Sequence, residues 1–107
     1  HGPKAALSKM LRSGNSSIFV VNNKRELLGY ILAEDASNAY ATGQKDLNGI
    51  IKDDMLKIDM DYPLENIVTD IQDAKIPICV VENNILKGII IKGTVLAALS
   101  KDEVENG

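Results

Sequence analysis

The sequence predicts a mixed α/β fold built from two copies of one helix–hairpin–helix unit. Residues 3–21 return as residues 63–81 at a constant offset of 60. In each copy, apolar residues at helical spacing follow a proline, and two runs of β-branched and aliphatic residues follow that helix. A repeat at a fixed period dictates the architecture, so we expect two pseudo-symmetric units packed as one compact pair.

Proline marks the start of the first helix in both copies. Pro3 matches Pro63, and proline suits the first position of a helix, where its missing N–H is not needed. The apolar residues that follow at helical spacing are Ala6, Leu7, Met10 and Leu11 in one copy and Leu64, Ile67, Val68 and Ile71 in the other. Each copy therefore begins with an amphipathic helix.

Two apolar runs after each helix predict a β-hairpin. Residues 18–21 return as 78–81, and after a polar turn residues 27–32 return as 86–91, with one residue deleted between them. A second helix should close each unit, over residues 34–42 before Gly43 and over residues 94–100. We expect Asp35 and Thr94, or their neighbours, to cap these helices.

A lead-in strand is predicted before the second copy only. In residues 57–61, Ile58 and Met60 alternate with charged residues, as in a half-buried strand. The first copy has no counterpart, because the chain begins where the matching residues would end. We therefore expect a piece of a longer protein, with unit 1 at residues 1–51, lacking its first strand, and unit 2 at residues 52–107.

Composition argues against several classes of function. The chain of 107 residues is 45% hydrophobic and 25% charged, with a net charge of −3 and only one Phe and three Tyr, which argues against stacking on nucleic acid. No apolar run is long enough to span a membrane, and no signal peptide is visible. The acidic residues at 53–61 lack the spacing and central glycine of a calcium loop and predict a solvated linker.

Catalytic groups are scarce. Cys79 is the only cysteine and lies within an apolar strand, which predicts a buried structural thiol, and the only histidine is His1. A Gly-rich phosphate loop, zinc-ligand spacing and a nucleophile elbow are all missing from the sequence. We therefore expect no catalytic residue and no metal site in this piece.

The two units resemble a tandem pair of cystathionine-β-synthase (CBS) domains. The resemblance rests on two helix–hairpin–helix copies that share the pattern Leu-x-Gly-x-Ile, at Leu27, Gly29 and Ile31 and again at Leu86, Gly88 and Ile90. Within that superfamily, residues 2–7 and 27–36 resemble the C-terminal regulatory pair of the ATPase subunit of glycine betaine, carnitine and proline ABC importers.

This resemblance implies a regulatory module of an osmoprotectant importer. In that family the pair follows the nucleotide-hydrolysing domain, so the implied partners are that domain, the membrane subunits and a second copy in a homodimer, on the cytoplasmic face of the cell membrane. CBS pairs bind adenosine ligands in clefts between their units, and related importers respond through this region to cyclic di-AMP or to ionic strength. An adenine nucleotide is thus the implied ligand, with no cofactor in this piece.

The ribose-binding motif of CBS units is only partly present. It places Ser or Thr, two residues, then Asp after the second hairpin strand, because an ionised carboxylate can accept both ribose hydroxyls. Residues 32–35 keep the aspartate, whereas residues 91–94 keep neither group. We hypothesise an apolar cleft for adenine with Lys92 facing a phosphate, completed across a homodimer interface. The candidate ligand residues are Tyr30, Leu32, Asp35, Ile89, Ile91, Lys92 and Thr94.

Structural roles compete with this hypothesis. The aliphatic residues could be core, Lys92 solvated and Asp35 only an N-cap. The pair could also be a ligand-free dimerisation module that senses ionic strength through charged faces, which salt screens over about 8 Å under physiological conditions. A third interpretation is the regulatory tail of a nucleotide-biosynthetic enzyme, which should keep better ribose motifs.

Overall fold

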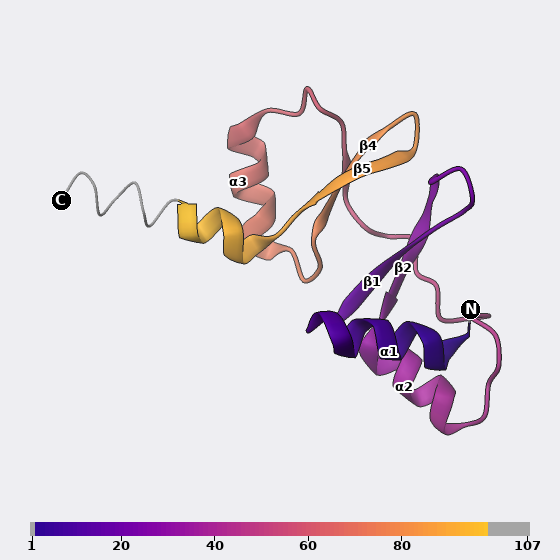
Figure 1. The fold of residues 1–107 in the computed structure, drawn as a ribbon. Helices are drawn as coiled ribbons and strands as arrows, with labels where there is room; N and C mark the ends of the chain where they lie inside the picture. The colour runs from indigo at the N-terminus through magenta and orange to yellow at the C-terminus, as the bar shows by residue number, and fades with distance from the viewer. Residues whose placement is uncertain (1, 99–107) are drawn as a thin grey trace. The chain divides into compact units, whose positions relative to one another are not determined.

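A computed structural model describes residues 2–98, and its elements alternate in the predicted order (Figure 1). They are α1 (Pro3–Ser13), β1 (Ser17–Val21), β2 (Leu27–Leu32), α2 (Ala33–Ala41), β3 (Lys57–Ile58), α3 (Leu64–Asp73), β4 (Ile78–Glu82) and β5 (Ile85–Ile90), followed by helical backbone at residues 92–98. Strands β1 and β2 form one sheet, and β3, β4 and β5 form another. This confirms the mixed α/β fold and the helix–hairpin–helix order of both copies.

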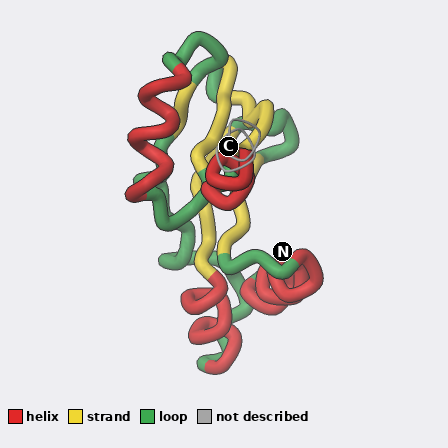
Figure 2. The backbone as a smooth tube through the Cα atoms, turned by 90° about the vertical axis from the view of Figure 1, so that its left-hand side faces the viewer, coloured by secondary structure: helices red, strands yellow, loops and turns green. Residues whose placement is uncertain are grey.

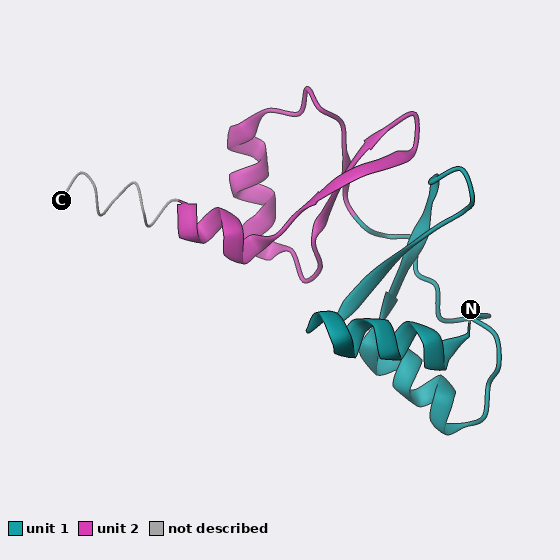
Figure 3. Cartoon of the chain, viewed as in Figure 1, with its two compact units in different colours: residues 1–55 teal, residues 56–107 magenta. Residues whose placement is uncertain are grey.

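The backbone divides into two compact units, residues 1–55 and residues 56–107 (Figure 3). The division falls after Met55 instead of after Ile51. Lys52 forms an antiparallel bridge with Tyr30, which keeps this segment with the first unit. Each unit has a buried core of its own.

The first unit is centred on side chains from α1, β2 and α2. Met10, Ile31 and Ala36 are buried together, one from each of these elements. Helix α1 ends at Ser13, and the left-handed φ of 71° at Gly14 turns the chain so that the Asn15 N–H donates to the Met10 carbonyl at 3.0 Å. Both helices therefore pack on one hairpin, and β2 runs into α2 without an intervening loop (Figure 2).

The two hairpins share an irregularity, which supports the duplication. The antiparallel register shifts between Val20 and Val21 in the first hairpin and between Val80 and Val81 in the second. Bulges of this kind bend a strand and increase its twist. The same backbone distortion thus occurs at the same place of both copies.

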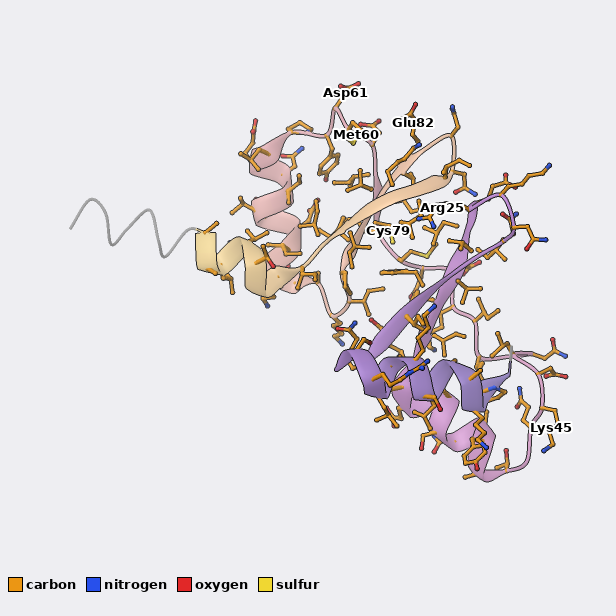
Figure 4. All side chains as sticks on the ribbon, viewed as in Figure 1. Arg25, Lys45, Met60, Asp61, Cys79 and Glu82 are labelled. Carbon is orange, nitrogen blue, oxygen red and sulfur yellow. The ribbon has the colours of Figure 1, made fainter. Side chains whose placement is uncertain are left out.

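The lead-in strand is shorter than predicted. β3 ends at Ile58, and Asp59 begins a turn in which its Oδ1 atom accepts the N–H of Asp61 at 2.9 Å. Ile58 is buried as expected, whereas Met60 is 73% exposed and lies on the turn (Figure 4). The alternation predicted for residues 57–61 is therefore wrong beyond Ile58.

The predicted helix caps are also wrong. Leu32 occupies the N-cap position of α2 and makes no side-chain capping bond, because β2 leads directly into the helix. Asp35 lies in the first turn instead. The last helix begins at residue 92, so Thr94 lies inside its first turn. The predicted end of this helix at residues 99–100 lies outside the described residues.

Candidate ligand site

The aspartate expected to bind ribose lies where β2 meets α2. Asp35 is in the first turn of α2, where the helix N-terminus favours a negative charge, and its side chain is 32% exposed. The Nζ atom of Lys52 lies 3.8 Å from its Oδ2 atom. Such a partly exposed pair contributes at most about 1 kcal/mol. The carboxylate can therefore accept hydrogen bonds from a ligand that displaces or shares Lys52.

The segment that carries Lys52 is held against the outer edge of β2. The Tyr30 N–H donates to the Lys52 carbonyl at 2.8 Å, and the Lys52 N–H donates to the Tyr30 carbonyl at 2.9 Å. This approach requires the neighbouring glycine, because a Cβ on Gly29 would lie 2.3 Å from the Lys52 carbonyl oxygen. Backbone pairing thus places Lys52 beside α2.

The Tyr30 side chain makes a second contact that holds the same segment in place. It is only 7% exposed, its hydroxyl donates to Asp54 Oδ1 at 2.5 Å, and its ring packs edge-on against Phe19. The hydrogen bond to Asp54, then burial, then the charges of Asp54, Asp35 and Asp53 raise the pKa of Tyr30 to about 12. Tyr30 therefore stays neutral at physiological pH and supports the segment that carries Lys52.

A shallow hollow of ≈ 320 Å³ lies beside Asp35 and Lys52. Asp35 and Asn38 line it from α2, Thr42 lines it from the C-cap of that helix, and Ile50 and Lys52 line it from the segment that follows. The hollow combines a carboxylate, an amide, an ammonium group and an aliphatic side chain. This combination suits a small ligand that carries both hydroxyl and anionic groups.

The remaining candidate residues lie in the second unit. Ile89 and Ile91 are 46% and 47% exposed, and Thr94 is exposed at the position that corresponds to Asp35. The Nζ atom of Lys92 donates to the Gln72 carbonyl at 2.8 Å, near the negative C-terminal end of α3. Lys92 is therefore engaged by its own unit, and a phosphate would have to compete with that carbonyl.

The structure brings Tyr30, Leu32 and Asp35 together in the first unit and the other four candidates together in the second. It adds Lys52, which sequence reasoning missed. No pattern marked this lysine, because it lies outside the residue ranges in which the repeat was found. Only the bridge to Tyr30 shows that it reaches Asp35.

Other chemistry is limited in the described part of the chain. Across residues 2–98, no three His, Cys, Asp or Glu side chains are grouped to hold a metal ion, and no helix is long and apolar enough to cross a bilayer. Cys79 is buried as predicted (Figure 4). Burial raises the pKa of its thiol to about 11, although the charge of Lys57 opposes this.

In sequence, the chain resembles ATP-binding proteins of glycine betaine transporters. It is 43% identical over 103 residues to the glycine betaine/carnitine transport ATP-binding protein GbuA of Listeria monocytogenes, a match that covers 96% of this chain and 26% of GbuA. It is 37% identical over 100 residues to the glycine betaine transport ATP-binding protein OpuAA of Bacillus subtilis, covering 92% of this chain and 24% of OpuAA. The chain thus spans about a quarter of the length of these relatives. No family model matches it.

In structure, the chain has the fold of a tandem CBS-domain pair. Staphylococcus aureus OpuCA matches with a TM-score of 0.82 and 24% identity, over 94% of this chain and 87% of OpuCA. The CBS domain pair of protein MJ0100, solved with 5′-methylthioadenosine and S-adenosyl-L-methionine, matches with a TM-score of 0.75 and 16% identity, over 95% and 84%. CbpB, solved with c-di-AMP, matches with a TM-score of 0.80 and 19% identity, over 100% and 79%.

Proposed function

We propose that this CBS-domain pair is the regulatory, ligand-sensing module of the ATPase subunit of an osmoprotectant ABC importer. The likeness to GbuA and OpuAA supports the transporter, because it extends over nearly the whole chain. The proposed partners are a second copy in a homodimer, the ATPase domain and the membrane subunits, on the cytoplasmic face of the membrane. The module itself senses and does not catalyse.

The proposed ligand is an adenine nucleotide such as cyclic di-AMP. The Asp35 carboxylate beside Lys52 is the observation that carries this proposal, because it offers an acceptor for ribose hydroxyls and a cation for a phosphate within 3.8 Å of each other. Solved CBS neighbours in complex with c-di-AMP and with adenosine compounds support the ligand class.

The second unit contributes an apolar surface to this proposal. Ile89 and Ile91 are about half exposed at the end of β5 and can pack against a flat adenine ring. Lys92 and Thr94 follow them at the start of the last helix. Because Lys92 is bonded to the Gln72 carbonyl, Lys52 is the stronger candidate for the phosphate contact.

Isothermal titration calorimetry of the chain with cyclic di-AMP, AMP and ATP tests the proposal. Saturable heat with cyclic di-AMP supports it, and no heat with any of the three contradicts it. Asp35→Asn removes one negative charge with little change of shape and should weaken binding about tenfold or more, because charged hydrogen bonds contribute about 1.5–3 kcal/mol. Asp53→Asn makes the same charge change on an exposed neighbour of Lys52 and should leave affinity within about twofold.

The second unit is tested separately. Ile91→Asp places a negative charge beside the proposed adenine position and should abolish binding, and Lys92→Glu, at the less favoured phosphate contact, should weaken it. Unchanged affinity in both variants would remove the second unit from the site, while the Asp35 result would still report on the first.

A ligand-free module that dimerises and senses ionic strength is the second candidate function. This candidate is favoured because charged side chains of the proposed site already have partners within the chain. Asp35 lies beside Lys52, and Lys92 bonds the Gln72 carbonyl. Salt screens such exposed pairs. If the calorimetry shows no heat, the dimer fraction from analytical ultracentrifugation between about 0.05 and 0.5 M salt decides whether this candidate holds.

A further inference from the structure

One amide side chain of the hollow beside α2 has no hydrogen-bond partner among the described residues. Asn38 is exposed in the middle of α2 and lines the same hollow of ≈ 320 Å³ as the proposed ribose acceptor. Two other polar side chains of that hollow are already engaged. The Thr42 hydroxyl donates to the Ala39 carbonyl at 3.0 Å, and Gln44 Nε2 donates to the Asn48 carbonyl at 2.8 Å. The Asn38 amide is therefore available to a ligand.

The spacing of Asn38 from Asp35 suits a nucleoside. The two residues are three positions apart in α2, which places their Cβ atoms about 5–6 Å apart on one side of the helix. In a nucleoside, the ribose hydroxyls and the edge of the base are separated by a comparable distance. A nucleoside whose ribose is bound at Asp35 can therefore bring the edge of its base to the Asn38 amide.

Comparison of the two copies sets Asn38 apart from an ordinary helix residue. In the second unit, Thr94 stands in place of Asp35 and Ala97 stands in place of Asn38. The carboxylate and the amide thus occur together in the first unit, and the second unit has neither. Asparagine also favours a helix less than alanine does, so helix stability does not explain Asn38.

The hydrogen-bonding groups of an amide match one edge of adenine. Adenine presents its N6 amine, a donor, beside N7, an acceptor, whereas guanine presents two acceptors, O6 and N7, at the same edge. Whichever way the Asn38 amide turns, its oxygen would meet an acceptor of guanine. In a nucleotide with an anti base, this edge lies on the side of the 5′-phosphate, and the hollow is also lined by the phosphate candidate Lys52.

We propose that Asn38 reads the N6–N7 edge of an adenine whose ribose is bound at Asp35, and so selects adenine over guanine. This inference rests on the proposed function and names the residue that sets its ligand specificity. Asn38 Oδ1 accepts from the N6 amine, Nδ2 donates to N7, and Ile50 supplies an apolar contact within the same hollow. Because the amide uses only the edge of the ring, the proposed packing of Ile89 and Ile91 on a face of adenine is compatible with it.

Calorimetry with three ligands tests the proposal. They are cyclic di-AMP, its 7-deaza analogue, in which a C–H group replaces N7 of each adenine, and cyclic di-GMP. The wild-type chain should bind the analogue and cyclic di-GMP each about tenfold or more weakly than cyclic di-AMP, because a bidentate amide contact discriminates by roughly this factor.

Asn38→Ala should remove this discrimination. The variant should bind cyclic di-AMP and the 7-deaza analogue with equal affinity, because the partner of N7 is gone. Its melting temperature should not fall, since alanine favours a helix more than asparagine does. The matched control is Asn66→Ala, which removes an exposed asparagine from α3 in the second unit and should keep both the affinity and the discrimination of the wild-type chain.

The outcomes separate this inference from the proposed function. If the wild-type chain binds cyclic di-AMP and the 7-deaza analogue equally, the inference is overturned and the proposed function stands. Discrimination that survives in Asn38→Ala has the same meaning. If the wild-type chain does not bind cyclic di-AMP, the proposed function and the inference are both overturned.

Discussion

Gly29→Ala is the sharpest test of how the candidate site is assembled. A Cβ at Gly29 would lie 2.3 Å from the Lys52 carbonyl oxygen and 2.7 Å from Ile51 Cγ2, so the segment must move away from β2. The repeat supplies a matched control. Gly88 occupies the same place in the second hairpin, where no heavy atom of the described residues lies within 4 Å of such a Cβ.

The loss of stability expected for Gly29→Ala follows from the contacts that the segment around Lys52 makes. Two backbone hydrogen bonds join Tyr30 to Lys52 and one side-chain bond joins Tyr30 to Asp54, each worth about 1 kcal/mol. Replacing glycine by alanine also lowers the conformational entropy of the unfolded chain. This stabilises the folded protein by roughly 0.5 kcal/mol and offsets part of the loss. Gly29→Ala should therefore destabilise the protein by about 2 kcal/mol, whereas Gly88→Ala should be neutral or stabilising by about 0.5 kcal/mol.

Thermal and urea unfolding of both variants, followed by circular dichroism, measures this difference. In a chain of this size a difference of about 2 kcal/mol lowers the melting temperature by about 10 °C. Gly29→Ala should also lose the slow exchange of the Tyr30 and Lys52 amides, while Gly88→Ala keeps it. If the two variants unfold within about 0.5 kcal/mol of each other, the segment is not fixed by this close approach.

Two predictions concern titratable groups. Tyrosine ionises near pH 10 when unfolded, and the pKa of Tyr30 is about 12 in the folded chain, so its contribution to the free energy of unfolding is full below pH 10 and is lost as pH rises towards 12. Tyr30→Phe should flatten that decline and remove a step near pH 12 from an absorbance titration of the tyrosines, and an unchanged titration would contradict the Asp54 contact. Burial raises the pKa of Cys79 to about 11, so Ellman's reagent at pH 8 should react at least about a hundredfold more slowly with the folded chain than with the chain in urea. Equal rates would show that the thiol is accessible.

Local patterning was sufficient to predict most of the fold. The helices that follow Pro3 and Pro63 and the paired strands of both hairpins depend on residues close in sequence, and the structure confirms them. The two errors have different causes, a side chain that competes with the regular backbone and a missing loop between two elements. Asp59 bonds the N–H of Asp61 and ends β3 early, and the direct passage from β2 to α2 places Leu32 at the N-cap.

The candidate site was harder to predict because its contacts are long-range. Asp35 could be found from the CBS motif, since it lies at a fixed position after a strand. Lys52 could not, because its approach depends on pairing with Tyr30, 22 positions earlier in the chain. The bond from Lys92 to the Gln72 carbonyl likewise joins residues that only packing brings together.

The divergence of the two copies predicts how many ligand molecules bind per chain and per dimer. Asp35 has Thr94 as its counterpart, so within this motif each chain offers one carboxylate as the proposed ribose acceptor. Cyclic di-AMP has two equivalent adenosines, and the proposed homodimer would present two copies of Asp35, so we expect one cyclic di-AMP per dimer but one AMP per chain. In cyclic di-AMP each ribose keeps only its 2′-hydroxyl, whereas AMP offers both hydroxyls to the carboxylate. Asp35→Asn should therefore weaken AMP binding by a larger factor than it weakens each half of cyclic di-AMP binding, and equal losses would place the Asp35 carboxylate away from the ribose.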